Sequence, residues 1–167
     1  AAPGEAPPAR RILAQTARVG EMMRRISDFA TARSEAPECV DVNAMLKALC
    51  DFHAFDRRFR GMPIEFRPGA DLPACQLVPD HLNEVMMNLL LAVADARPPA
   101  AARQALQVQT DAGAGWVHIH VGLDDAGVAL AGLDAALAVD PRLDTVRRRV
   151  GELGGQLVVA EGRLRIS

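Results

Sequence analysis

Apolar residues recur every three or four positions across residues 10 to 34, which predicts one amphipathic helix. The apolar stripe consists of Ile12, Thr16, Val19, Met23, Ile26 and Ala30. Steps of four and three residues alternate along it, as in the seam of a coiled coil. We therefore expect Ile12, Val19, Met23 and Ile26 to form a homodimer interface with the same helix of a second copy. The alternative is that the stripe packs on the chain's own domain.

Three further segments have the spacing of helices. They cover residues 42–60, 79–96 and 142–153, and a short helix is expected within residues 123–140. The segment 79–96 has the broadest apolar face, and Pro79 at its start and Arg97-Pro98-Pro99 at its end mark its limits. Asp41 or Asn43 is expected to cap the helix that begins at residue 42.

Alternating apolar and polar residues predict five strands. They cover residues 62–67, 105–110, 116–121, 156–160 and 163–166, and residues 68–79 are expected to be turns. The order of these elements predicts an α/β two-layer sandwich, a mixed sheet with helices on one face, preceded by an amphipathic dimerisation helix. We assign residues 1–35 to a partial dimerisation region and residues 36–167 to the sandwich domain.

Composition excludes several classes of partner. The 167 residues are half apolar and carry a net charge of −2, so nothing attracts the chain to nucleic acid or anionic lipid. No apolar run approaches the ~18 residues of a membrane span, and we expect a cytoplasmic protein. Its three cysteines lack C-x-x-C spacing, which favours reduced thiols over disulfides or zinc.

The stretch from Glu84 to Ala96 reads E-V-M-M-N-L-L-L-A-V-A-D-A. It resembles the first nucleotide-site helix of sensor histidine kinases, E/Q-x-x-x-N-L-x-x-N-A-x-D-A. Weaker similarities to that family follow in the same order along nearly the whole chain, from residues 26–30 and 39–43 to residues 55–65 and 71–80. The resemblance implies the GHKL, or Bergerat, ATPase-like fold, in which nucleotide sits between this helix and two glycine-rich segments.

The resemblance also implies vestigial nucleotide-binding candidates, which are Asn88, Asp125 and Gly127. The second asparagine of the motif is replaced by Ala92, which cannot ligate Mg²⁺ and is expected on the exposed helix face. Asp140 and Arg142 replace two glycines of the second glycine-rich segment. Alternatives remain for two candidates: Asp125 as a solvated strand-end residue, and Asn88 as a surviving helix-face residue.

Catalytic residues are not expected in this segment. His53, His81, His118 and His120 all lack the acidic context of the family's phosphorylated histidine. His118 and His120 share a strand face, but no third ligand is near them in sequence, so no metal site is expected.

These observations favour a two-component signalling protein of histidine kinase type with an impaired ATP site, acting as a dimeric pseudokinase or interaction module. No cofactor is expected beyond weak, Mg²⁺-independent binding of ATP or ADP. Its partner would be a response regulator or another kinase. The alternatives are an active divergent histidine kinase, or a histidine phosphotransferase with a kinase-like fold and a histidine before Ala1.

Overall fold

The computed structural model describes residues 36–54, 56–59, 61–124, 133–160 and 163–166. All of them belong to one compact unit, Ser34–Ser167. The predicted helix over residues 10–34, with Ile12, Val19, Met23 and Ile26, lies outside the described residues. The homodimer interface therefore stays a prediction.

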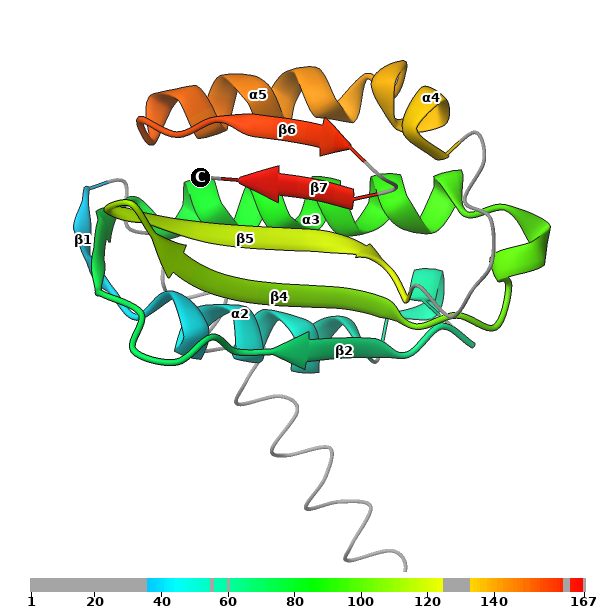
Figure 1. The fold of residues 1–167 in the computed structure, drawn as a ribbon, viewed down its shortest axis with the longest axis horizontal. Coiled ribbons are helices and arrows are strands. Elements are labelled where there is room, and N and C mark those ends of the chain that lie inside the picture. The colour runs from blue at the N-terminus through cyan, green and yellow to red at the C-terminus, as the bar shows by residue number, and fades with distance from the viewer. Residues whose placement is uncertain (1–35, 55, 60, 125–132, 161–162, 167) are drawn as a thin grey trace, which may run out of the picture. The chain divides into compact units, whose positions relative to one another are not determined.

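A five-stranded sheet forms one layer of this unit (Figure 1). Its strands, in spatial order, are β2 (Ile64–Arg67), β4 (Leu106–Gly113), β5 (Trp116–Leu123), β7 (Arg163–Ile166) and β6 (Leu157–Ala160). The β2–β4 pair is parallel and the other pairs are antiparallel. The sheet is therefore mixed, as predicted.

Helices form the second layer. They are α2 (Val42–His53), α3 (Pro79–Ala96), the short α4 (Leu133–Ala138) and α5 (Arg142–Glu152). The inward positions of β4 and β5 are fully buried at Val108 and Val121, as are Leu89 of α3 and Val146 of α5. One apolar core between sheet and helices results, which confirms the predicted two-layer α/β sandwich.

The helix predicted over residues 42–60 ends earlier, at His53. The backbone N–H of Ala54 closes its last turn on the Cys50 carbonyl. A separate 3-10 turn, η1 (Arg57–Phe59), follows, and the Asp56 carboxylate accepts the Arg58 backbone N–H at its start. An acidic residue that caps a new turn therefore divides what the apolar spacing suggested was one helix.

Two short strands were not predicted from the sequence. β1 (Glu38–Val40) and β3 (Cys75–Leu77) pair antiparallel in a small sheet of their own, with Cys39 opposite Gln76. Three residues are too few to show alternation, and β3 lies in the segment predicted to be turns. A second 3-10 turn, η2 (Pro99–Ala101), follows α3.

The β4–β5 hairpin is longer than predicted. Its turn contains only Ala114 and Gly115, with φ of 52° and 82°. Positive φ at both central residues suits a two-residue turn whose twist matches the strands. Ala112 and Gly113 therefore continue β4, although neither has the side chain of a typical strand residue.

Asp41, rather than Asn43, caps α2, and its carboxylate accepts the Ala44 N–H at 3.0 Å. Asn43 instead joins three elements. Its amide donates to the Gly69 carbonyl at 3.0 Å, the Gly69 N–H donates to the Thr110 hydroxyl at 2.8 Å, and that hydroxyl donates to the Asn43 carbonyl oxygen at 2.7 Å. This closed ring fixes the start of α2 against β4 and the loop that follows β2.

Candidate functional site

The end of α3 meets the beginning of α5 through charged side chains. Arg142, the first residue of α5, donates from Nη1 to the Asp95 carboxylate at 2.7 Å. Its Nε and Nη2 donate to Asp140 at 2.9 and 2.6 Å. One guanidinium thus joins two carboxylates, one on α3 and one just before α5.

Asp140 is the better enclosed of these two carboxylates, since its side chain is 10% exposed and that of Asp95 is 67% exposed. It also accepts the Arg142 backbone N–H at 2.9 Å. The hydrogen bonds from Arg142 hold the pKa of Asp140 below its usual value, and the same contacts raise the pKa of Arg142. Asp140 is therefore ionised at neutral pH, and its carboxylate accepts the first backbone N–H of α5.

A second ion pair joins the same helices at their other ends. Nε of Arg149, near the end of α5, lies 2.5 Å from Glu84, near the start of α3. Arg149 also contacts Glu152 of its own helix at 2.9 Å. The two helices are thus antiparallel and ion-paired at both ends.

Asn88 and Ala92 lie one turn apart on α3, and the exposure of Ala92 differs from expectation. The Asn88 amide is half-buried and donates to the Glu84 carbonyl of the preceding turn at 2.8 Å. Ala92 is 0% exposed, so the expectation that it lies on the exposed helix face is wrong. Its methyl group suits the apolar packing of α3, where a polar side chain would need a buried partner.

Asp125 and Gly127 lie outside the described residues, so their positions relative to Asn88 stay predictions. The neighbouring Asp124 is described. Its backbone N–H donates to the Ala105 carbonyl at 2.9 Å, and its carboxylate accepts from Gln107 at 3.0 Å. Asp124 is thus held to β4.

The histidines do not converge. His53 is 0% exposed in α2 and lies edge-on to the rings of Phe52 and Phe59. His118 and His120 share one face of β5 with ring centres 6.4 Å apart, and His120 contacts Asp111 at 2.7 Å. Within the described part of the chain, no group of three or more His, Cys, Asp or Glu residues has the arrangement of a metal site.

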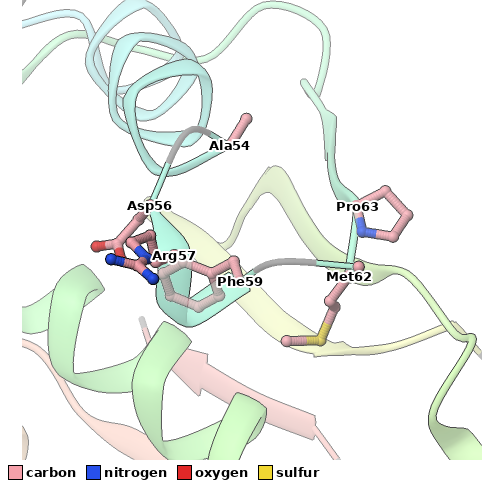
Figure 2. A pocket seen from close by; sticks show the side chains of 7 residues that line it. Ala54, Asp56, Arg57, Phe59, Met62 and Pro63 are labelled. Carbon is pink, nitrogen blue, oxygen red and sulfur yellow. The ribbon is translucent and has the colours of Figure 1, made fainter.

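A cavity of about 410 Å³ opens between the end of α2 and the start of β2 (Figure 2). It is lined by Ala54, Asp56, Arg57, Phe59, Gly61, Met62 and Pro63. Hydrogen bonds from Arg58 lower the pKa of Asp56 to about 2. This cavity could not be predicted from the sequence, because its wall follows from the early end of α2. None of the predicted nucleotide-site residues lines it.

No protein-family model and no curated protein matches the chain. Solved structures do match. The cytoplasmic segment of histidine kinase QseC has a TM-score of 0.59 at 12% identity, covering 90% of this chain and 91% of that one. The histidine kinase domain of the blue-light activated kinase EL346 from Erythrobacter litoralis has a TM-score of 0.58 at 17% identity, covering 94% and 83%.

Full-length ShkA, solved in complex with AMPPNP, has a TM-score of 0.56 at 16% identity. The match covers 98% of this chain and 39% of ShkA, so the chain spans well under half of that protein. These likenesses show that the fold is the one found in histidine kinases. Among the described helices, none is long and apolar enough to cross a membrane.

Proposed function

We propose that this chain is part of a two-component signalling protein of histidine kinase type, that its ATP site is impaired, and that it acts as a dimeric pseudokinase or interaction module. The fold supports the kinase-type origin. The Arg142 contacts support the impairment, because Asp140 places an ionised carboxylate at the start of α5. There, the family resemblance calls for a glycine-rich segment that receives phosphate.

The charges at the start of α5 determine whether phosphate can bind there. The amides at a helix start attract anions, but here the Asp140 carboxylate already accepts one of them. Arg142, the nearest cation of α5, is neutralised by Asp140 and Asp95. A triphosphate would therefore meet two carboxylates that repel it and a guanidinium whose charge they already neutralise.

The residues present also do not fit the Mg²⁺ that the family resemblance implies. Mg²⁺ needs several oxygen ligands in near-octahedral positions. Ala92 supplies none and is buried. Asn88 supplies at most one, its Oδ1, since its amide nitrogen donates to the Glu84 carbonyl. We therefore expect any ATP or ADP to bind weakly and without Mg²⁺, with Asp125 as the adenine-reading residue.

The partners proposed for this module are a second copy, through Ile12, Val19, Met23 and Ile26, and a response regulator or another kinase. Two other functions remain in competition. An active divergent histidine kinase would need Mg-ATP at this site, and a histidine phosphotransferase would need a phosphoacceptor histidine before Ala1.

A phosphotransfer assay tests the proposal. The chain is mixed with labelled ATP, Mg²⁺ and a separate dimerisation-helix protein that carries a phosphoacceptor histidine, and label on that histidine is followed. We expect none above a control without the chain. Transfer of label to the supplied histidine would instead establish the active kinase.

A further inference from the structure

Arg142 forms ion pairs both with the end of α3 and with the segment before α5. It uses Nη1 for Asp95, and Nε and Nη2 for Asp140. The Asp140 pair is a two-pronged contact, which is geometrically more restrictive than a single charge pair. We call Arg142, Asp95 and Asp140 the Arg142 latch.

We infer that the Arg142 latch itself holds the beginning of α5 against the end of α3, as a built-in lock on this helix pair. The inference rests on the proposed function, since it assigns to protein carboxylates the place that nucleotide phosphates would take. It goes further by making the start of α5 fixed by the protein's own charges rather than controlled by a ligand.

Removal of the guanidinium would do more than delete two contacts. Asp140 is nearly enclosed, so its carboxylate would lose its main partner, and a poorly solvated charge without a partner is costly. The Asp140 carboxylate would still accept the backbone N–H of residue 142, but no cation would join it to Asp95. The start of α5 would then be held in place by apolar packing at Leu143 and Val146 without the ion pair, while the Arg149–Glu84 pair would keep the far ends together.

The two halves of the latch differ in exposure. The Asp95 side chain is 67% exposed, so its pair with Arg142 is open to screening by salt. Arg58 also acts electrostatically on Asp95, and it stays charged in every variant considered below. The contact between the helices should therefore loosen with salt before the contact within the α5 start does.

Amide hydrogen exchange tests the latch on the full chain. The readout is the exchange of residues 144–148 in α5, with the centre of β4 and β5 as an internal check that the fold persists. We expect Arg142→Gln to speed this exchange by about tenfold at low salt, and Asp95→Asn, which spares the Asp140 pair, by about threefold.

Arg147→Gln is the matched control, because Arg147 pairs only with Asp144 of its own helix, at 3.0 Å, among the ion pairs found. It should leave exchange in residues 144–148 within about twofold of wild type. Arg142→Lys keeps the charge without the planar fork and should fall between wild type and Arg142→Gln. High salt, about 1 M, should speed exchange in wild type and change Arg142→Gln little.

Equal exchange in Arg142→Gln and Arg147→Gln would overturn the latch. If Arg142→Gln unfolds, Asp95→Asn decides, and exchange equal to wild type in that variant would overturn it as well. A parallel series with Mg²⁺ and AMPPNP separates the two ideas. Protection of wild-type α5 by nucleotide would contradict the proposed function, whereas the contrast between variants without nucleotide bears on the latch alone.

Discussion

Ala92 packs with no exposed surface on α3, so a polar side chain there enters the core. We predict that Ala92→Asn lowers the free energy of unfolding by about 1–3 kcal/mol, because the new amide would be buried in apolar packing without a hydrogen-bond partner. Urea denaturation measures this. Ala94→Asn, at a half-buried position of the same helix, should cost only about half a kcal/mol of helix propensity. Equal costs at both positions would mean that position 92 opens onto a polar cleft.

The buried ring of His53 predicts that stability depends on pH. Both ring nitrogens are buried without a hydrogen-bond partner among the described residues, and the nearest carboxylate oxygen, of Asp56, is 3.9 Å from Nδ1. Burial lowers the pKa of His53 below its ordinary 6.5, against a smaller opposing effect of Asp56. The folded state therefore resists a proton that the unfolded state accepts.

This lower proton affinity of folded His53 determines the direction in which stability changes with pH. Stability is fully present above pH ~6.5 and falls as the pH drops toward the folded pKa, by at most about 1.4 kcal/mol per pH unit. His53→Leu should remove this part of the pH dependence and should not lower stability at pH 7. Urea titrations between pH 7.5 and 5.5 measure both, with the half-exposed His81→Gln as the control for losing a histidine. An unchanged pH slope in His53→Leu would contradict the assignment.

Elements are held together by a few polar links as well as by the core. The ring of Asn43, Gly69 and Thr110 connects α2, the loop after β2, and β4. Thr110 is 5% exposed, and a methyl group at Gly69 would lie 2.3 Å from the Thr110 carbonyl oxygen. That close approach explains why glycine occupies position 69.

We predict that Thr110→Val lowers the free energy of unfolding by about 1–3 kcal/mol, because the Gly69 N–H and the Asn43 carbonyl oxygen both lose their partner. Thr145→Val, at a half-buried position of α5, should change it by less than about 0.5 kcal/mol. Thermal and urea unfolding of both variants provide the comparison. A Thr110→Val protein as stable as wild type would show that the ring contributes nothing to the joint.

Long elements with strong periodicity could be predicted from sequence. α3 was found over its full length because its apolar face repeats for five turns between two prolines. The end of α2 was missed because Asp56 caps a new turn inside an apolar pattern, and β1 and β3 were missed because three-residue strands carry no period. Local hydrogen bonding and long-range pairing, which spacing does not record, decided these cases.

The candidate site was predictable only in part. Motif spacing located Asn88, Ala92, Asp140 and Arg142, but it could not show that Ala92 is buried. Nor could it show that Arg142 bridges to Asp95, because that contact joins residues 47 positions apart. Asp125 and Gly127 stay predictions.

The apolar stripe of residues 12–30 predicts a dimer. Val19→Asp combined with Ile26→Asp should convert it to a monomer, because two charges would be buried in each helix of the seam. Light scattering after size-exclusion chromatography gives the mass. Arg18→Asp combined with Arg25→Asp, away from the stripe, should leave the dimer intact. A monomeric wild type, or a dimer that survives the first pair, would contradict the prediction.

Titration calorimetry of the full chain with AMPPNP, with and without Mg²⁺, tests most directly whether the nucleotide site is impaired. We predict weak or undetectable heat and no gain in affinity from Mg²⁺, because Ala92 supplies no ligand and Arg142 is held by Asp95 and Asp140. Low-micromolar affinity that depends on Mg²⁺, about −8 kcal/mol of binding free energy, would show that the site is not impaired.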